Sequence, residues 1–158
     1  MSQPTRVFAS IVSARIEPAV LLARAGGPDH GAVILFLGTV RDHNEGRLVS
    51  GVRYDAYVEM AEEVLGQIAE EAAALSEGGR VAVVHRVGEL DVEEVSVAVV
   101  VSSAHRAAAY SASRHVIEEI KRRLPVWKQE RYQEGDARWL DGVTPAAAGA
   151  PARARRKP

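Results

Sequence analysis

The chain has 158 residues, no cysteine and a formal net charge of -1 at pH 7. This length fits one domain with a hydrophobic core, and the lack of cysteine excludes disulfides, thiolate nucleophiles and cysteine-based zinc sites. A near-neutral charge is not typical of nucleic-acid-binding proteins, which usually carry a basic excess. The longest apolar runs are too short to span a bilayer, and the first residues lack the pattern of a secretory signal. We therefore expect a soluble cytoplasmic protein that would need another molecule to bring any sulfur it handles.

The first half of the chain alternates between strand and helix patterns. Arg6–Val12 predicts a strand, and Glu17–Arg24 predicts a short helix because a proline suits the first helical turn. Gly31–Val40 is an apolar run typical of a buried strand. Gly51–Tyr57 alternates between two kinds of side chain, which indicates a strand with two differently exposed faces. Glu59–Leu75 carries an apolar stripe at helical spacing and is the clearest predicted helix.

The second half continues the same mixture of elements. Arg80–Val87 and Glu94–Val101 are rich in β-branched residues and predict two neighbouring strands. Ser102 and Ser103 are good N-cap residues, so they predict the start of a long helix that runs to Arg123.

The last predicted elements are a strand at Trp127–Tyr132 and a short strand near Trp139, and residues 144–158 have the composition of a disordered tail. The predicted order is therefore β-α-β-β-α-β-β-α-β, in one domain that covers residues 1–143. Locally paired strands combined with three helices favour the α+β class over a doubly wound parallel sheet.

The chain uses lysine sparingly. It has 20 lysine and arginine residues, but the only lysines are Lys121, Lys128 and Lys157. An ammonium loses its proton when it is desolvated or lies near other cations, whereas a guanidinium does not. Lys121 and Lys128 are therefore our candidate catalytic amines. The alternative is two surface lysines in a basic stretch, with Lys121 held protonated by Glu118 on the same helical face.

Two further segments could bind an anion. His105 and Arg106 lie at the predicted start of the third helix, where unpaired backbone N–H groups favour anions. Arg41 follows a buried strand and suits bidentate contact with a phosphate or carboxylate. The alternatives are an ordinary capped helix and a solvated turn. The histidines lack metal-ligand spacing and no nucleotide-binding motif is present, so we expect neither a metal nor a cofactor.

Six segments taken together resemble the large, catalytic subunit of molybdopterin synthase, in the order and at the spacing of that family. They cover about residues 30–140. The segments are Gly31-Ala32-Val33 through Gly38-Thr39-Val40-Arg41-Asp42-His43-Asn44; Tyr57 with Met60; Val84-His85-Arg86-Val87-Gly88-Glu89-Leu90; Ser103-Ala104-His105-Arg106; Lys121 through Pro125-Val126-Trp127-Lys128-Gln129-Glu130; and Glu134-Gly135-Asp136 with Trp139.

The resemblance implies an α/β-hammerhead-like fold with an additional antiparallel sheet. It also implies insertion of two sulfur atoms into cyclic pyranopterin monophosphate (precursor Z), which forms the dithiolene of molybdopterin. The sulfur would arrive on the thiocarboxylated C-terminal Gly-Gly of a ubiquitin-like small subunit, within a heterotetramer built around a dimer of large subunits. By the same resemblance, Lys121 and Lys128 are the catalytic lysines, and Arg41, His105 and Arg106 form the pocket for the pterin phosphate.

The chain departs from the family pattern in two places. Val126 replaces the aromatic residue that is common between the proline and the tryptophan, and the stretch after Trp139 lacks a charged segment. Two other interpretations remain open at this point. One is a non-enzymatic α+β module that binds a phosphorylated metabolite or RNA, and the other is a structural role in which residues 121–131 dock an acidic partner.

Overall fold

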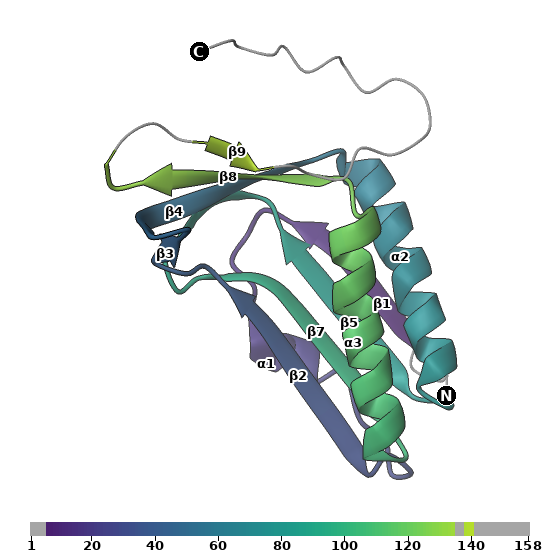
Figure 1. Ribbon diagram of the computed structural model, residues 1–158. Helices are drawn as coiled ribbons and strands as arrows, with labels where there is room; N and C mark the ends of the chain where they lie inside the picture. The colour runs from purple at the N-terminus through teal and green to yellow at the C-terminus, as the bar shows by residue number, and fades with distance from the viewer. Residues whose placement is uncertain (1–5, 135–137, 141–158) are drawn as a thin grey trace.

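The computed structural model describes residues 6–134 and 138–140, and it shows two β-sheets and three helices (Figure 1). The strands are β1 (Val7–Val12), β2 (Ala32–Thr39), β3 (His43–Asn44), β4 (Arg47–Ala56), β5 (Arg80–Arg86), β6 (Gly88–Asp91), β7 (Val95–Ser103), β8 (Val126–Tyr132) and β9 (Arg138–Leu140). The helices are α1 (Pro18–Leu22), α2 (Val58–Leu75) and α3 (Arg106–Arg123).

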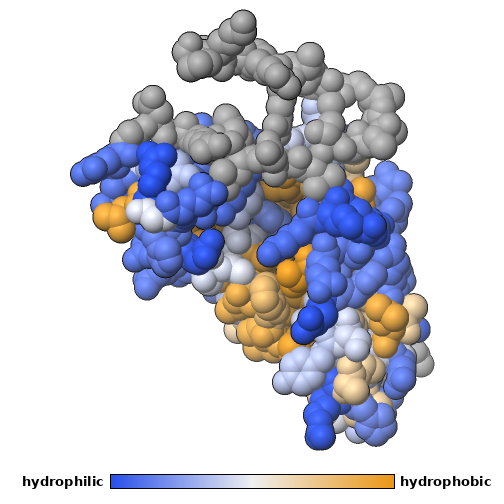
Figure 2. Space-filling view, in the orientation of Figure 1, coloured by the Kyte–Doolittle hydropathy of each residue, from blue (hydrophilic) through white to orange (hydrophobic). Residues whose placement is uncertain are grey.

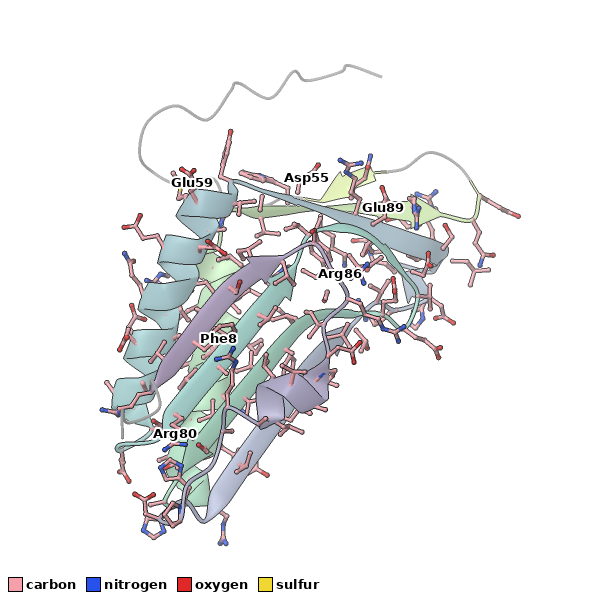
Figure 3. The ribbon with its side chains drawn as sticks, turned by 180° about the vertical axis from the view of Figure 1, so that it is seen from behind. Phe8, Asp55, Glu59, Arg80, Arg86 and Glu89 are labelled. Carbon is pink, nitrogen blue, oxygen red and sulfur yellow. The ribbon has the colours of Figure 1, made fainter. Side chains whose placement is uncertain are left out.

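The first sheet has the strand order β1-β5-β7-β2, with β1 parallel to β5 and the other pairs antiparallel. Helices α2 and α3 pack on one face, and their buried residues share the largest hydrophobic core with β1, β5 and β7. The short helix α1 covers part of the other face (Figure 3), where Leu21 joins a second core. The central strands β5 and β7 are therefore buried on both faces, which explains why they read as continuous β-branched runs.

The second sheet lies across one end of the first (Figure 1). Its central strand is β4, which pairs with β3, β6 and β8, and β9 extends the sheet beyond β8. Val40, Val49, Val52, Leu90 and Tyr132 form its small core. The opposite face carries ion pairs of Arg53 and Arg131 with acidic neighbours, including the labelled Asp55 and Glu89 in Figure 3. One face of this sheet is thus packed and the other is charged.

The α+β class and a second, antiparallel sheet are confirmed. The two β-branched runs predicted as neighbouring strands are indeed neighbours, and the structure shows that β5 and β7 pair antiparallel. The structure is consistent with the predicted order of nine elements and adds the short strands β3 and β6. Strand β9 lies where the sequence predicts a short strand near Trp139. Strand β6 was missed because it is only four residues long. The expected tail, residues 144–158, lies outside the described residues.

The predicted start of the third helix was wrong. Strand β7 continues through Ser103, and α3 begins at Arg106 with His105 as its N-cap. The reason is that both serines are fully buried and their hydroxyls have tertiary partners: Ser103 Oγ donates to the carbonyl of Ser76 (2.8 Å), and Ser102 Oγ accepts from Gly26 N–H (3.0 Å). Neither hydroxyl caps the helix. In the described part of the chain, no helix is long and apolar enough to cross a membrane.

The turn between α2 and β5 depends on close backbone approach at Gly79. A Cβ at this position would lie 1.8 Å from the carbonyl oxygen of Ser102 and 2.8 Å from Ser76 Oγ. The first contact is with backbone of the neighbouring strand, which cannot rotate away. By contrast, a Cβ at Gly66, in the middle of α2, would meet nothing within 4 Å.

We expect Gly79→Ala to lower the free energy of unfolding by about 1–3 kcal/mol, because an inserted methyl group forces the backbone to shift. Gly66→Ala is the matched control and should raise it by about 0.5–1 kcal/mol, since alanine has the higher helix propensity. Denaturant unfolding at one fixed protein concentration measures both. Equal effects of the two substitutions would show that the contact at Gly79 is not limiting.

Candidate functional site

An open hollow with about 280 Å³ of empty space lies where the end of β2 meets the second sheet. Its lining is mainly polar and comes from the β2–β3 connection, β4 and β8. The lining residues are Thr39, Val40, Arg41, His43, Val52, Tyr54, Lys128 and Glu130. Two of the predicted site residues, Arg41 and Lys128, are therefore brought together from positions 87 residues apart, the difference between their numbers.

The register between β4 and β8 builds one wall of the hollow. Tyr54 lies opposite Lys128, and Val52 lies opposite Glu130. Directly opposed residues of an antiparallel pair share a face of the sheet, as do residues two apart on one strand. All four side chains therefore point to the same side, and a shift of one residue would turn Lys128 to the charged outer face.

The β3–β4 hairpin supplies the opposite rim. Glu45 and Gly46 form its two-residue turn with φ of 49° and 75°, the left-handed values that type I′ hairpin turns require. This turn pairs His43 with Leu48 and holds the preceding Arg41 and Asp42 beside the sheet. His43 Nδ1 lies 2.7 Å from Asp42 Oδ1.

Glu130 lines the hollow, and the sequence analysis did not name it as a site candidate. Its side chain is buried, with the residue 2% exposed, yet its carboxylate accepts hydrogen bonds from Asn44 Nδ2 (2.9 Å) and Tyr132 OH (2.9 Å) and pairs with Lys128 Nζ (3.0 Å). Burial by itself would raise the pKa of Glu130, but the bonds from Lys128, Tyr132 and Asn44 outweigh it and hold the pKa below its ordinary value. Glu130 thus remains ionised and ties β3, β8 and the Lys128 ammonium together. The only sequence signal was its position two residues after Lys128.

The tyrosine wall of the hollow is backed by a buried histidine. The rings of Tyr54 and His85 meet edge to face with centroids 5.1 Å apart. Burial lowers the pKa of His85 to about 4, although its hydrogen bond to the Arg86 carbonyl (2.9 Å) opposes that shift. His85 is therefore neutral at physiological pH and acts here as packing, not as a cation.

Lys121 lies in the last turn of α3 and is exposed. The pair with Glu118, on which the alternative interpretation of Lys121 depends, does not form. The neighbouring cations are engaged instead: Arg122 pairs with Glu119 (2.6 Å), and Arg123 pairs with Glu119 and Glu71. Lys121 forms no ion pair or side-chain hydrogen bond with any described residue.

His105 and Arg106 lie at the other end of α3. Lys121 follows Arg106 by fifteen positions, which corresponds to about 22 Å along a helix axis. Within one chain the predicted site residues therefore fall into separate places: Arg41 and Lys128 in the hollow, Lys121 at the C-terminal end of α3, and His105 with Arg106 at its N-terminal end. Like Lys121, both Arg41 and Arg106 lack an ion-pair partner among residues 6–134.

The hollow offers cations and hydrogen-bond donors. Within the described ranges, no group of three or more His, Cys, Asp or Glu side chains could hold a metal ion. A fixed ammonium and a guanidinium beside tyrosine, threonine and histidine groups suit a small anionic ligand. The fold and this hollow together define a small α+β protein with a polar, cation-containing binding site.

Comparison with known proteins identifies the family. The model of the "MoaE protein" family matches residues 11–123. The molybdopterin synthase catalytic subunit of Thermoplasma volcanium is 39% identical over 132 residues, which are 84% of this chain and 96% of the relative. The crystal structure of molybdopterin synthase from Staphylococcus aureus superposes with a TM-score of 0.79 at 35% identity, covering 84% of this chain and 96% of that one. The chain belongs to the MoaE protein family.

A more distant structure shows the same fold in a complex. It is the complex of subunits 1 and 2 of the molybdopterin-converting factor from Helicobacter pylori, with a TM-score of 0.64 at 20% identity, covering 79% of this chain and 85% of that one. At this identity the likeness shows the fold alone. The family resemblance read from the six sequence segments is confirmed by the family match and the 39% identical relative.

The Glu130 network gives a prediction about stability. Glu130→Gln replaces the charged acceptor with an amide whose N–H₂ faces three donors, so we expect the free energy of unfolding at pH 7 to fall by about 1–3 kcal/mol. The pKa of Glu130 lies below 4.5 in the folded protein, so its contribution is fully present above that pH and is lost as the pH falls through the folded-state pKa. The difference between wild type and variant should therefore shrink below pH 4.5.

Denaturant unfolding between pH 3 and pH 7 measures this difference. Glu89→Gln is the matched control, because Glu89 is a half-exposed carboxylate on the same sheet that pairs with Arg53 and Arg131. A surface pair of this kind contributes about 0–1 kcal/mol. A Glu130→Gln effect that stayed constant across the whole pH range would contradict an ionised Glu130.

Proposed function

We propose that this chain is the catalytic subunit of a molybdopterin synthase. It transfers sulfur from the thiocarboxylated C-terminus of a ubiquitin-like small subunit to cyclic pyranopterin monophosphate and so forms the dithiolene of molybdopterin. The observation that carries the proposal is the hollow in which Arg41 and Lys128 meet, in a chain of the MoaE protein family. The reaction proposed here would take place in the cytoplasm.

The chemistry of the chain fits a reaction in which a partner brings the sulfur. The chain has no cysteine, so it has no thiol of its own to donate. A thiocarboxylate and a cyclic phosphate are both anions, and both need cationic groups that are not already neutralised. Arg41, Arg106 and Lys121 have no ion-pair partner in the described part of the chain, which leaves them free for such ligands. The Helicobacter pylori protein of the same fold is found with a second subunit, as this proposal requires.

A dimer of this chain would bring the separated site residues together. Strand β2 is an edge of the first sheet, and it exposes the apolar side chains of Val33 (48%), Phe36 (38%) and Leu37 (37%). Figure 2 shows an apolar area over β2 beside α3. Long apolar edge strands pair readily with another chain. The other edge, β1, is protected, because the carboxylate of Glu62 accepts a hydrogen bond from the backbone N–H of Ile11 (3.2 Å).

The direction of β2 decides which residues would meet. Its first residue, Ala32, lies near the start of α3, where Gly31 N–H donates to the carbonyl of Ala104 (3.2 Å), and its last residue, Thr39, lines the hollow. If two β2 strands pair antiparallel about a two-fold axis, the N-terminal end of one strand lies beside the C-terminal end of the other. His105 and Arg106 of one copy would then lie close to Arg41 of the second copy.

The same two-fold axis would make the two α3 helices antiparallel. The N-terminus of α3 in one copy would then point toward the C-terminal end of α3 in the other copy, which carries Lys121. The roles follow from the chemistry of each group. Arg41, His105 and Arg106 hold the phosphate. Lys128, fixed by Glu130, orients the substrate or the thiocarboxylate. Lys121 donates or accepts a proton or stabilises charge as sulfur adds.

We expect Lys121→Ala and Lys128→Ala each to slow the conversion of precursor Z by about 10²–10³-fold, as is typical when one preorganised donor is removed. Single-turnover mixing with the thiocarboxylated small subunit measures the rate. Arg122→Ala is the matched control, because it removes an exposed cation next to Lys121 that pairs with Glu119. Full conversion by both lysine variants would refute their catalytic roles.

Shared sites predict complementation between two inactive variants. Lys128→Ala and the double variant His105→Ala/Arg106→Ala should each be inactive alone. Co-expression should restore about one quarter of wild-type activity, because half of the randomly formed dimers are mixed and each mixed dimer has one intact site. Size-exclusion chromatography of the mixture confirms that dimers form. If the dimers form and no activity returns, the site does not combine residues of two copies.

A further inference from the structure

His43 lines the hollow together with Arg41 and Lys128, but it is not among the residues proposed to hold the phosphate or to act in sulfur transfer. We propose that His43, oriented by Asp42, is the general base that activates the water molecule which releases the small subunit after each sulfur transfer. This inference rests on the proposed function, since it concerns a step of that reaction.

The geometry leaves one imidazole nitrogen free. His43 Nδ1 lies 2.7 Å from Asp42 Oδ1, and a carboxylate only accepts hydrogen bonds, so Nδ1 carries the proton in this contact. In the neutral ring, Nε2 is then an acceptor. The His43 side chain is 63% exposed and lines the same hollow as Lys128. An aspartate that fixes the tautomer of a histidine in this way is a familiar arrangement of general bases.

The other groups of the hollow are less suited to take a proton from water. Arg41 is permanently protonated. Glu130 is buried and its carboxylate already has Asn44, Lys128 and Tyr132 as partners. Lys128 Nζ is already engaged by the Glu130 carboxylate at 3.0 Å. Among the described lining residues, His43 is the nitrogen base with a free acceptor atom.

Sulfur transfer from a thiocarboxylate needs such a base. When its sulfur adds to a carbon of the substrate, the acyl carbon of the small subunit remains bonded to that sulfur as a thioester. Water must then add to the acyl carbon while Nε2 of His43 accepts a proton from it. The acyl–sulfur bond breaks, its electron pair stays on the sulfur as a thiolate of the substrate, and the small subunit leaves as a carboxylate. The step involves no oxidation or reduction, and the protons pass to His43 and solvent.

The test uses the full-length protein, the thiocarboxylated small subunit and precursor Z under single-turnover conditions. His43→Gln should slow release of the small subunit by about 10²-fold or more, as expected for loss of a general base. A covalent adduct of the small subunit with the pterin should accumulate and be visible by mass spectrometry of the intact complex. A residue that only supports the fold would not produce this adduct.

Two further variants sharpen the result. His43→Ala should recover activity when imidazole is added, because the open hollow admits a small base in place of the missing ring. Asp42→Asn should also accumulate the adduct, since an amide no longer fixes the tautomer. His115→Gln is the matched control: His115 pairs with Glu71 on the α2–α3 surface, away from the hollow lining, and its loss should leave the rate unchanged.

The possible failures are distinguishable. If the wild-type protein forms no molybdopterin, the proposed function is wrong and this inference falls with it. If the wild type is active but His43→Gln releases the small subunit within about twofold of its rate, only the role of His43 is refuted. Slow turnover of His43→Gln without an adduct, combined with no rescue of His43→Ala by imidazole, would also overturn it.

Discussion

The hollow depends on one antiparallel register, the pairing of β4 with β8. This register sets Lys128 opposite Tyr54 and Glu130 opposite Val52, so a cation and its buried counterion share one face with the packed core of the second sheet. An uncompensated buried charge is costly, and the Glu130 carboxylate is compensated by donors from two different strands and by the Lys128 ammonium. The β3–β4 hairpin and strand β8 are thereby held against each other. The position of Arg41 at the rim relative to Lys128 at the wall follows from this one set of contacts.

The parts of this molecule that the sequence predicts well are those in which local pattern and tertiary environment agree. Helix α2 has an apolar stripe at helical spacing, and β5 and β7 are β-branched runs buried on both faces. The serines before α3 show where local preference fails. Their hydroxyls are good N-caps in isolation, but burial against Ser76 and Gly26 gives them other partners, so the strand continues to Ser103. Strand β6 has four residues, too few for a periodic signal, and its Leu90 is identified as core only by its three-dimensional neighbours.

In the candidate site, too, some residues could be predicted from the local sequence, whereas others could be identified only from the tertiary structure. Residue type alone pointed to Lys121, Lys128 and Arg41, because lysine is rare in this chain and because loops after buried strands often bind ligands. Glu130 had no such signal, since a single glutamate in a strand looks like any surface carboxylate until its burial and its three partners are known. The sequence also did not predict that His105 and Lys128 lie apart within one chain. The predicted length of a helix gives the distance between its two ends, but it does not show how two copies of the chain would face each other.

The way in which the chain uses its cations links the fold to the proposed chemistry. Arginines that hold the structure together have partners: Arg123 bridges Glu71 of α2 and Glu119 of α3, and Arg131 crosses the outer face of the second sheet to Glu89 and Asp91. Guanidinium groups suit this task because they form several bonds in a fixed plane. Arg41, Arg106 and Lys121 are different, since none has an ion-pair partner among the described residues, and each lies at an end of β2 or α3. Cations left unpaired at the ends of elements are available to groups from outside the chain. A two-fold arrangement over the β2 edge would gather these same cations around one anionic substrate, which is the physical reason to expect the site to be completed by a second copy.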